Sequence, residues 1–255
     1  MLLPPVTLRT LADALRRPAG RLPGPERTLH TMSGNAATDR WFRSADWDEA
    51  SQAEFTARLA RARPHNRYQY RRIKALALLE ARDRVRQAAG RALLEENLAL
   101  PDLPPHERTL ALGTLARNDL VGGRLSSAMR SLRGALAIGG PDASGTTGEE
   151  EIELAEVLLT RGGAGDIREA KALLDRRASD LPVFVRSRYR LAVAQVQASL
   201  LQADVSAAAD WASTALALAA TQDSGLRHHR ELGLVDADEA QLAWLREVAN
   251  PPAVE

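Results

Sequence analysis

The sequence predicts an all-α fold in which helical hairpins stack into an α-solenoid. Of the 255 residues 45% are hydrophobic but only 4% are aromatic, so Ala, Leu and Val supply most of the apolar surface and favour closely packed helices. An aliphatic residue followed three positions later by alanine recurs four times, at Val85/Ala88, Leu125/Ala128, Ile167/Ala170 and Val205/Ala208. The spacings of 40, 42 and 38 residues are typical of solenoids, whose units bury their apolar faces by stacking.

A further apolar residue follows each alanine by four positions, at Ala92, Leu132, Leu174 and Ala212. Helical spacing places the three residues of each set on one face, and the small alanine lets the two helices of a hairpin approach closely. We therefore expect the four alanines to occupy the same buried environment.

The chain divides into four predicted parts. Residues 1–40 are rich in Pro and Gly and predict a mobile arm. Residues 41–66 predict an N-terminal capping helix that begins at Asp46 or Asp48 and ends at Pro64. Residues 67–220 predict the helical repeats, and residues 221–255 a C-terminal capping helix, over 236–248, and a tail.

The repeat region predicts about four helix pairs with short links. The expected pairs are 68–82 with 85–98, 106–120 with 125–138, 149–161 with 166–179, and 183–202 with 205–220. Asp204 is the expected N-cap of the last helix, and Asp166 with Glu169 matches the capping pattern at the start of 166–179. The segment 142–148 predicts a polar loop.

The third pair resembles a tetratricopeptide repeat. The stretch from Ala155 to Leu174 contains a helix that ends near Gly162, a Gly165-Asp166 turn and an alanine at Ala170, and Pro182 follows it. The resemblance covers about residues 67–220; in the first two units most of the family's aromatic positions are missing. It implies a right-handed superhelix whose concave groove is lined by the first helix of each pair and receives a peptide or partner protein. A less regular helical-repeat or bundle fold is the alternative.

Composition excludes several classes of protein. Without cysteine, the chain forms no disulfide, thiolate nucleophile or Cys-ligated metal site. The first residues lack the pattern of a secretory signal, and the longest uncharged helical run, 191–203, is too short to span a bilayer. We therefore expect a cytoplasmic protein that does not contact a membrane.

Charge is distributed unevenly along the chain. Residues 1–92 contain 18 Lys/Arg and 9 Asp/Glu, whereas residues 93–255 contain 16 and 24. Such a dipole can steer an acidic partner or let molecules associate head to tail, although solvated arginines on helix surfaces also explain it. The basic segment 58–91, with Tyr68 and Tyr70 among its arginines, keeps a regulatory sensor module that contacts nucleic acid as the alternative function.

No pattern in the sequence indicates an enzyme, a metal site or a cofactor. His228 and His229 are adjacent and lack the spacing of a helical metal pair, and Gly162–Gly165 lies between helices rather than after a strand. The acidic clusters start predicted helices, where the helix dipole favours them. An enzyme would require the fold to assemble scattered residues such as Asp46, Arg72 and His106.

The leading hypothesis is a non-enzymatic adaptor that binds a protein or peptide in the concave groove. Oligomerisation is compatible with the same architecture. The expected groove residues lie on the first helices of the pairs and are Tyr70, Lys74, Arg117, Arg190 and Gln197.

Overall fold

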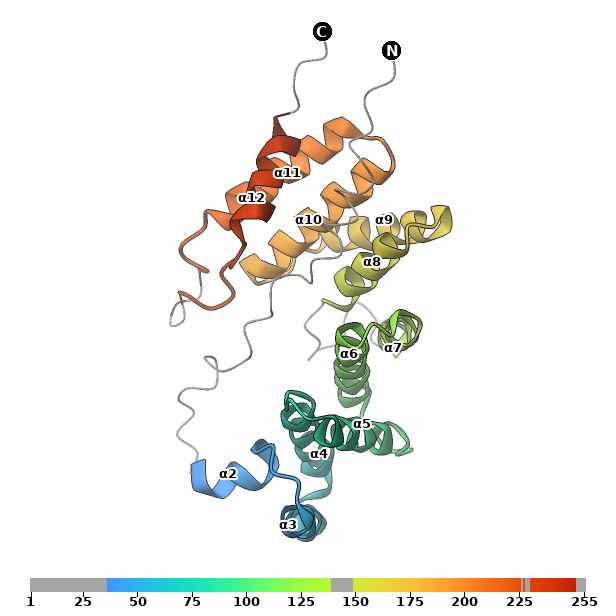
Figure 1. Ribbon diagram of the computed structural model, residues 1–255, viewed down its shortest axis with the longest axis vertical. Helices are drawn as coiled ribbons and strands as arrows, with labels where there is room; N and C mark the ends of the chain where they lie inside the picture. Colours follow the sequence, from blue (N-terminus) through green and yellow to red (C-terminus); the bar gives the residue numbers. More distant parts are fainter. Residues whose placement is uncertain (1–35, 139–148, 226, 228–229, 251–255) are drawn as a thin grey trace. The chain divides into compact units, whose positions relative to one another are not determined.

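The computed structural model describes residues 36–138, 149–225, 227 and 230–250. These residues form helices, turns and coil without a strand, which confirms the all-α prediction for this part of the chain. The helices pack as sequence neighbours, most of them in antiparallel hairpins (Figure 1). The chain divides into two compact units with their boundary between Glu150 and Glu151, and each unit is described by itself.

The first unit, residues 31–150, contains two hairpins preceded by two shorter helices. Hairpin α4–α5 packs on hairpin α6–α7 through contacts of α6 with both α4 and α5. The helices are α2 (Ala36–Arg43), α3 (Glu49–Arg61), α4 (Pro64–Leu79), α5 (Arg84–Leu98), α6 (Pro105–Val121) and α7 (Leu125–Ile138).

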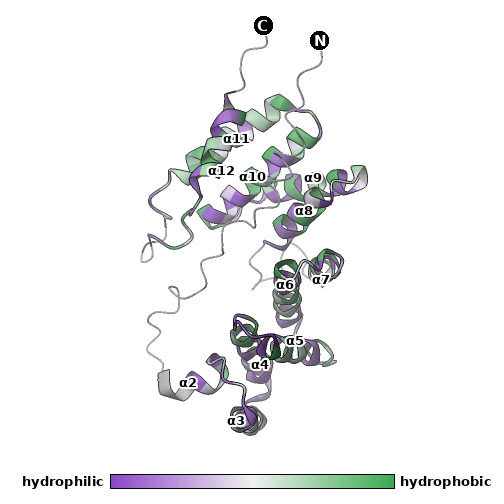
Figure 2. Cartoon of the chain, in the orientation of Figure 1, coloured by the Kyte–Doolittle hydropathy of each residue, from purple (hydrophilic) through white to green (hydrophobic). Residues whose placement is uncertain are grey.

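The second unit contains the helices that follow the polar segment 139–148, which lies outside the described residues. Helix α10 packs on α9 of the preceding hairpin, and α11 packs on both α10 and the last helix, α12. The helices are α8 (Glu150–Arg161), α9 (Ala164–Ser179), α10 (Val185–Leu201), α11 (Val205–Ala219) and α12 (Glu239–Ala249). In Figure 2, α11 is largely green, as expected for a helix rich in Ala and Leu.

Most predicted helix ends lie within two residues of the observed ones, and two of the predicted caps are present. The carboxylates of Asp48 and Asp204 accept hydrogen bonds from the backbone N–H of Ser51 (2.7 Å) and Ala207 (3.0 Å), as an N-cap does. Asp166 is not a cap: α9 begins two residues earlier, and this carboxylate forms an ion pair with Arg161.

Two further helix boundaries differ from the prediction at the start of the described chain. Helix α4 begins at Pro64 rather than near residue 68, because proline suits the first helical position, where its missing N–H is not needed. Helix α2 begins at Ala36, within the segment predicted as an arm, and residues 1–35 lie outside the described part.

Small residues mark the close approach of helices, but one of the four was assigned wrongly. Ala128, Ala170 and Ala208 are fully buried, whereas Ala88 is exposed. The small buried residue of α5 is Gly90 instead. A Cβ added there would lie 2.7 Å from the backbone oxygen of Ala75 in α4, so the two helices cross where one residue has no side chain.

The two units repeat one arrangement at a separation of 80 positions. Helices α5, α6 and α7 begin at residues 84, 105 and 125, and α9, α10 and α11 begin at residues 164, 185 and 205. Residues 80 positions apart are buried alike: Ala75/Ala155, Leu78/Leu158, Gly90/Ala170, Leu94/Leu174, Ala128/Ala208, Leu132/Ala212 and Ala135/Ala215. The structural repeat is therefore a four-helix unit present twice.

The turns α6–α7 and α10–α11 show the same correspondence in their backbone. The N–H of Arg124 donates to the oxygen of Asp119 (2.8 Å), and the N–H of Asp204 donates to that of Ser199 (2.9 Å). The residue before each donor has a left-handed backbone conformation: Gly123 has φ 70° and Ala203 has φ 60°. Ala203 thus adopts a conformation that suits glycine.

Each unit has a separate apolar core with a short helix closing one side. In the first unit, Phe42 of α2 and Phe55 and Leu59 of α3 are buried with residues of α4 and α5. In the second unit, Leu245 of α12 is fully buried among residues of α10 and α11. The predicted capping helix near the C-terminus is thus present as α12, over 239–249 rather than 236–248.

The long connection between α11 and α12 is held against the second unit by Gly233 and by Val235 and Ala237, which pack against the apolar core. Gly233 has φ 74°, and its carbonyl accepts a hydrogen bond of 2.7 Å from the N–H of Arg186, in the first turn of α10. A Cβ on Gly233 would lie 2.7 Å from the ring of Phe184. The connection therefore caps the start of α10 through a backbone that only glycine accommodates.

The substitution Gly90→Ala should destabilise the protein by about 1–3 kcal/mol, because the added methyl group meets backbone rather than a movable side chain. Gly134→Ala is the matched control: it is also within a helix, but its Cβ would meet only Leu112, at 3.4 Å. This control should stabilise by about 0.5–1 kcal/mol through helix propensity. Urea unfolding of both variants measures the difference, and equal effects would contradict the crossing at Gly90.

The substitution Ala203→Gly should raise the free energy of unfolding by about 1 kcal/mol, because glycine adopts φ near 60° without the strain of a Cβ. The reciprocal change, Gly123→Ala, should lower it by about the same amount, since no atom lies within 4 Å of the added Cβ and only the backbone conformation is strained. Thermal melts of both variants test the pair; a loss of stability in Ala203→Gly would refute the equivalence of the two turns.

Candidate binding surface

Tyr70 and Lys74, both predicted to line a groove, lie where α4 meets α2 and α3. The Tyr70 ring is half-buried against Trp41 and Phe42, with ring centroids 5.1 and 4.6 Å away. Lys74 is 1% exposed. The structure therefore brings these two residues together, but in the packing of the capping helices onto α4.

Polar and aromatic groups surround the ammonium of Lys74. Its Nζ donates to the backbone oxygens of Ser44 (2.8 Å) and Asp46 (2.9 Å), which follow the end of α2. The ring centroid of Trp47 lies 5.5 Å from it. Burial lowers the pKa of Lys74, and the carboxylates of Asp46, Glu54 and Asp48 oppose that effect. The ammonium thus caps carbonyls that would otherwise lack donors.

A small hollow opens beside this ammonium. It is lined by Arg40, Trp41, Ser44, Asp46, Ser51, Glu54, Arg58 and Lys74. Two exposed ion pairs occupy its rim, Arg58 with Glu54 (2.8 Å) and Arg40 with Asp46 (3.6 Å). These two ion pairs neutralise four of the charged groups that line the hollow, and the remaining one, the Lys74 ammonium, donates to backbone oxygens.

Arg117 and Gln197 occupy equivalent positions in the two units, because they are 80 positions apart on α6 and α10. Both side chains are half-buried. Their equivalence means that the same face of the first helix in a hairpin presents a long polar side chain in each unit.

Ion pairs join the first helices of successive hairpins within each unit. In the first unit, Arg72 of α4 donates to both carboxylate oxygens of Glu107 in α6, at 2.8 and 3.3 Å. In the second unit, Arg190 of α10 donates to both oxygens of Glu156 in α8, at 2.7 and 3.2 Å. Arg190, predicted as a groove residue, is therefore half-buried in a contact between helices.

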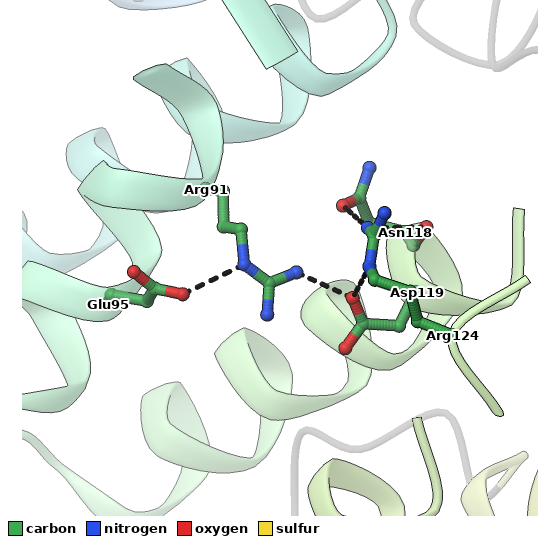
Figure 3. A network of polar contacts seen from close by, with 5 residues as sticks. All are labelled: Arg91, Glu95, Asn118, Asp119 and Arg124. Atoms are coloured by element: carbon green, nitrogen blue, oxygen red, sulfur yellow. Dashed lines mark hydrogen bonds and ion pairs between the residues drawn. The ribbon is translucent and has the colours of Figure 1, made fainter. Parts of the chain in front are cut away.

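A network of charged residues joins α5, α6 and the turn after α6 (Figure 3). Arg91 lies between Glu95 and Asp119, with distances of 2.9 and 2.6 Å, and Arg124 donates to the same Asp119 oxygen at 2.7 Å. The Asp119 side chain is fully buried. Burial acts to raise the pKa of Asp119, but hydrogen bonds from Ser127, Arg91 and Arg124 outweigh it and hold the pKa below its usual value.

At the equivalent interface in the second unit, a neutral amide donates to a carboxylate. Gln195 of α10 donates to the Asp175 carboxylate of α9 at 3.0 Å, and Ser199 replaces Asp119. At a different interface, between α10 and α12, Tyr189 donates to Gln241 at 2.9 Å, and burial raises the pKa of Tyr189 to about 12. The hydroxyl therefore stays protonated at neutral pH and remains a donor.

Much of the basic segment 58–91 has partners within the chain. Arg58, Arg72, Arg86 and Arg91 form ion pairs with carboxylates. Arg67 donates to the backbone oxygens of Ala60 and Ala62, so a large share of this positive charge is neutralised or directed at the protein itself. The nucleic-acid hypothesis stays a prediction.

Of the three residues considered for catalysis, Asp46, Arg72 and His106, the structure brings only the last two close to a shared residue. Arg72 and His106 both approach Glu107, at 2.8 and 4.0 Å, whereas Asp46 pairs with Arg40. Among the described residues, no three His, Asp or Glu side chains are grouped as metal binding requires. None of the helices in this part of the chain combines the length and the apolar character needed to cross a bilayer.

Sequence reasoning missed the buried polar residues Asp119 and Gln195, and it placed Lys74 in a groove rather than in the packing around α4. The equivalent positions give a usable signal for Lys74 and Gln195, because the residues 80 positions away, Leu154 and Leu115, are buried leucines. In comparisons with known proteins, no family model, curated protein or solved structure matches the chain.

The substitution Asp119→Asn should lower the free energy of unfolding by about 2 kcal/mol at neutral pH, because it leaves Arg91 and Arg124 without their shared carboxylate. The pKa of Asp119 is lower in the folded state than in the unfolded state. The stabilisation of the fold by this carboxylate is therefore complete above the unfolded-state pKa of about 4, and it is lost as the pH falls through the folded-state pKa. Unfolding measured at several pH values should show the cost of the substitution shrinking below about pH 4; a cost that is independent of pH would contradict it.

Proposed function

We propose that this chain is a non-enzymatic scaffold that binds a protein or peptide through the first helices of its hairpins. The supporting observation is the four-helix unit present twice at a separation of 80 positions. Repetition of this kind supplies one surface several times along a chain, and extended binding surfaces arise when such units stack. The tetratricopeptide-like right-handed superhelix and its concave groove are part of this proposal.

The equivalence of Arg117 and Gln197 supports the choice of face. Side chains that pack the hairpins recur as Ala, Leu or Gly in both units, whereas this position carries a long hydrogen-bonding side chain in each. Lys74 and Arg190 hold helices together in the folded chain, so charge reversal at either residue would report on folding as well as on binding.

The test uses affinity purification with the full-length chain as bait, followed by mass spectrometry to identify recovered proteins. Gln197→Glu and Arg117→Ala should each reduce recovery of a specific partner by about fivefold or more, as expected for residues at the centre of an interface. Arg130→Glu on α7 and Arg168→Glu on α9 are controls on exposed positions of second helices.

Circular dichroism and thermal melts must show that the variants remain folded. The proposed face would be refuted if both first-helix variants recover the partner normally while the second-helix controls lose it. Binding would then lie on the surface formed by the second helices. Absence of any specific partner would refute the scaffold itself.

A further inference from the structure

Helix α5 has a second apolar face that does not pack within the described chain. Val85 is 76% exposed, and Ala88 and Ala92 are exposed on the same face. Successive residues of an α-helix are rotated by about 100°, so this stripe lies opposite the buried Gly90 and Leu94. The apolar spacing that predicted intrachain packing at 85–92 thus belongs to the outer surface.

Charges at the two ends of this face oppose the helix dipole. The first turn of α5 carries Arg84 and Arg86, and the last turn carries Glu95 and Glu96. A helix dipole favours acidic groups at its start and basic groups at its end; here only the cap Asp83 follows that rule at the start. Arg84 and Glu96 are exposed and form no ion pair among the described residues.

We infer that the outer face of α5, defined by Val85, Ala88 and Ala92, packs antiparallel against the same face of a second copy of this chain. A two-fold axis near position 90 places Ala88 of each helix beside Ala92 of the other, and these small residues permit close approach. Arg84 of each helix then meets Glu96 of its partner, both of them unpaired within the described chain, so the face is complementary to itself.

The charge pattern of α5 identifies the partner helix as α5 of a second copy. An antiparallel copy of the same helix supplies acidic groups at the basic end and basic groups at the acidic end, and it also opposes the two helix dipoles favourably. A single pair of 15-residue helices forms an interface at the small end of those that are stable. The dimer should therefore depend on protein concentration and weaken with salt.

Sedimentation velocity of the full-length chain, from about 1 μM to about 300 μM, tests for this self-association. The expected result is a monomer–dimer equilibrium whose dissociation constant rises about tenfold between ~50 mM and ~500 mM NaCl. A monomer over the whole concentration range at low salt would overturn the inference.

Charge reversals then test the face and its orientation. Arg84→Glu and Glu96→Arg should each weaken self-association by about tenfold, because like charges meet at both ends of the pair. An equimolar mixture of the two variants should restore association, since each supplies the charge that the other lacks. Arg168→Glu, on the exposed side of α9, is the control and should leave it unchanged.

Both charge-reversal variants should remain folded, because Arg84 and Glu96 are exposed and have no ion-pair partner in the described part of the chain. Circular dichroism checks this. Association that is unaffected by either reversal would assign the dimer to another surface and refute this one. Loss in the single variants without recovery in the mixture would refute the antiparallel arrangement.

Discussion

The close approach of paired helices is the constraint on which the rest of this structure depends. Where α5 crosses α4, a methyl group on Gly90 would lie within 2.7 Å of a backbone oxygen, so the helices meet through their main chains. That contact leaves Leu78 and Leu94 fully buried beside it. Ala128, Ala170 and Ala208 supply the same small volume in the other hairpins, where they too are fully buried.

The helix boundaries could be predicted from the sequence because local signals fix them. Asp48 and Asp204 cap helices through side-chain oxygens, and Gly123 and Gly162 turn the chain with positive φ. The register of α5 could not be predicted in the same way, because apolar residues lie on two of its faces. Val85 with Ala88 fits the expected pattern as well as the face containing Gly90 does, and only packing against α4 distinguishes them.

The candidate site was less predictable than the fold for a physical reason. A lysine at position 74 reads as a surface residue, yet its ammonium is buried because two backbone oxygens and an aromatic ring replace water around it. Those groups come from residues about 30 positions earlier, and nothing in the local sequence shows that they converge. Arg117 and Gln197 could be placed on the first helices from periodicity alone.

The two units show that one backbone framework tolerates different polar chemistry at equivalent interfaces. Between α5 and α6 the framework holds a buried carboxylate with two guanidinium groups, whereas between α9 and α10 the Gln195 amide donates to the Asp175 carboxylate. Several buried apolar residues are identical in the two units, among them Ala75/Ala155, Leu78/Leu158, Leu94/Leu174 and Ala128/Ala208, whereas Ala111 and Leu115 correspond to Leu191 and Gln195. The apolar contacts therefore determine the arrangement, and the polar residues adapt to it.

The anchoring of Gly233 beneath α10 has a consequence for engineering the chain. The connection from residue 220 to 238 is long enough to suggest a convenient point for inserting a reporter domain. Its second half is not free to accept one, because the carbonyl of Gly233 and the ring of Phe184 hold the backbone against the start of α10. A fusion placed near Gln222 and Asp223, which are exposed, would leave that attachment undisturbed.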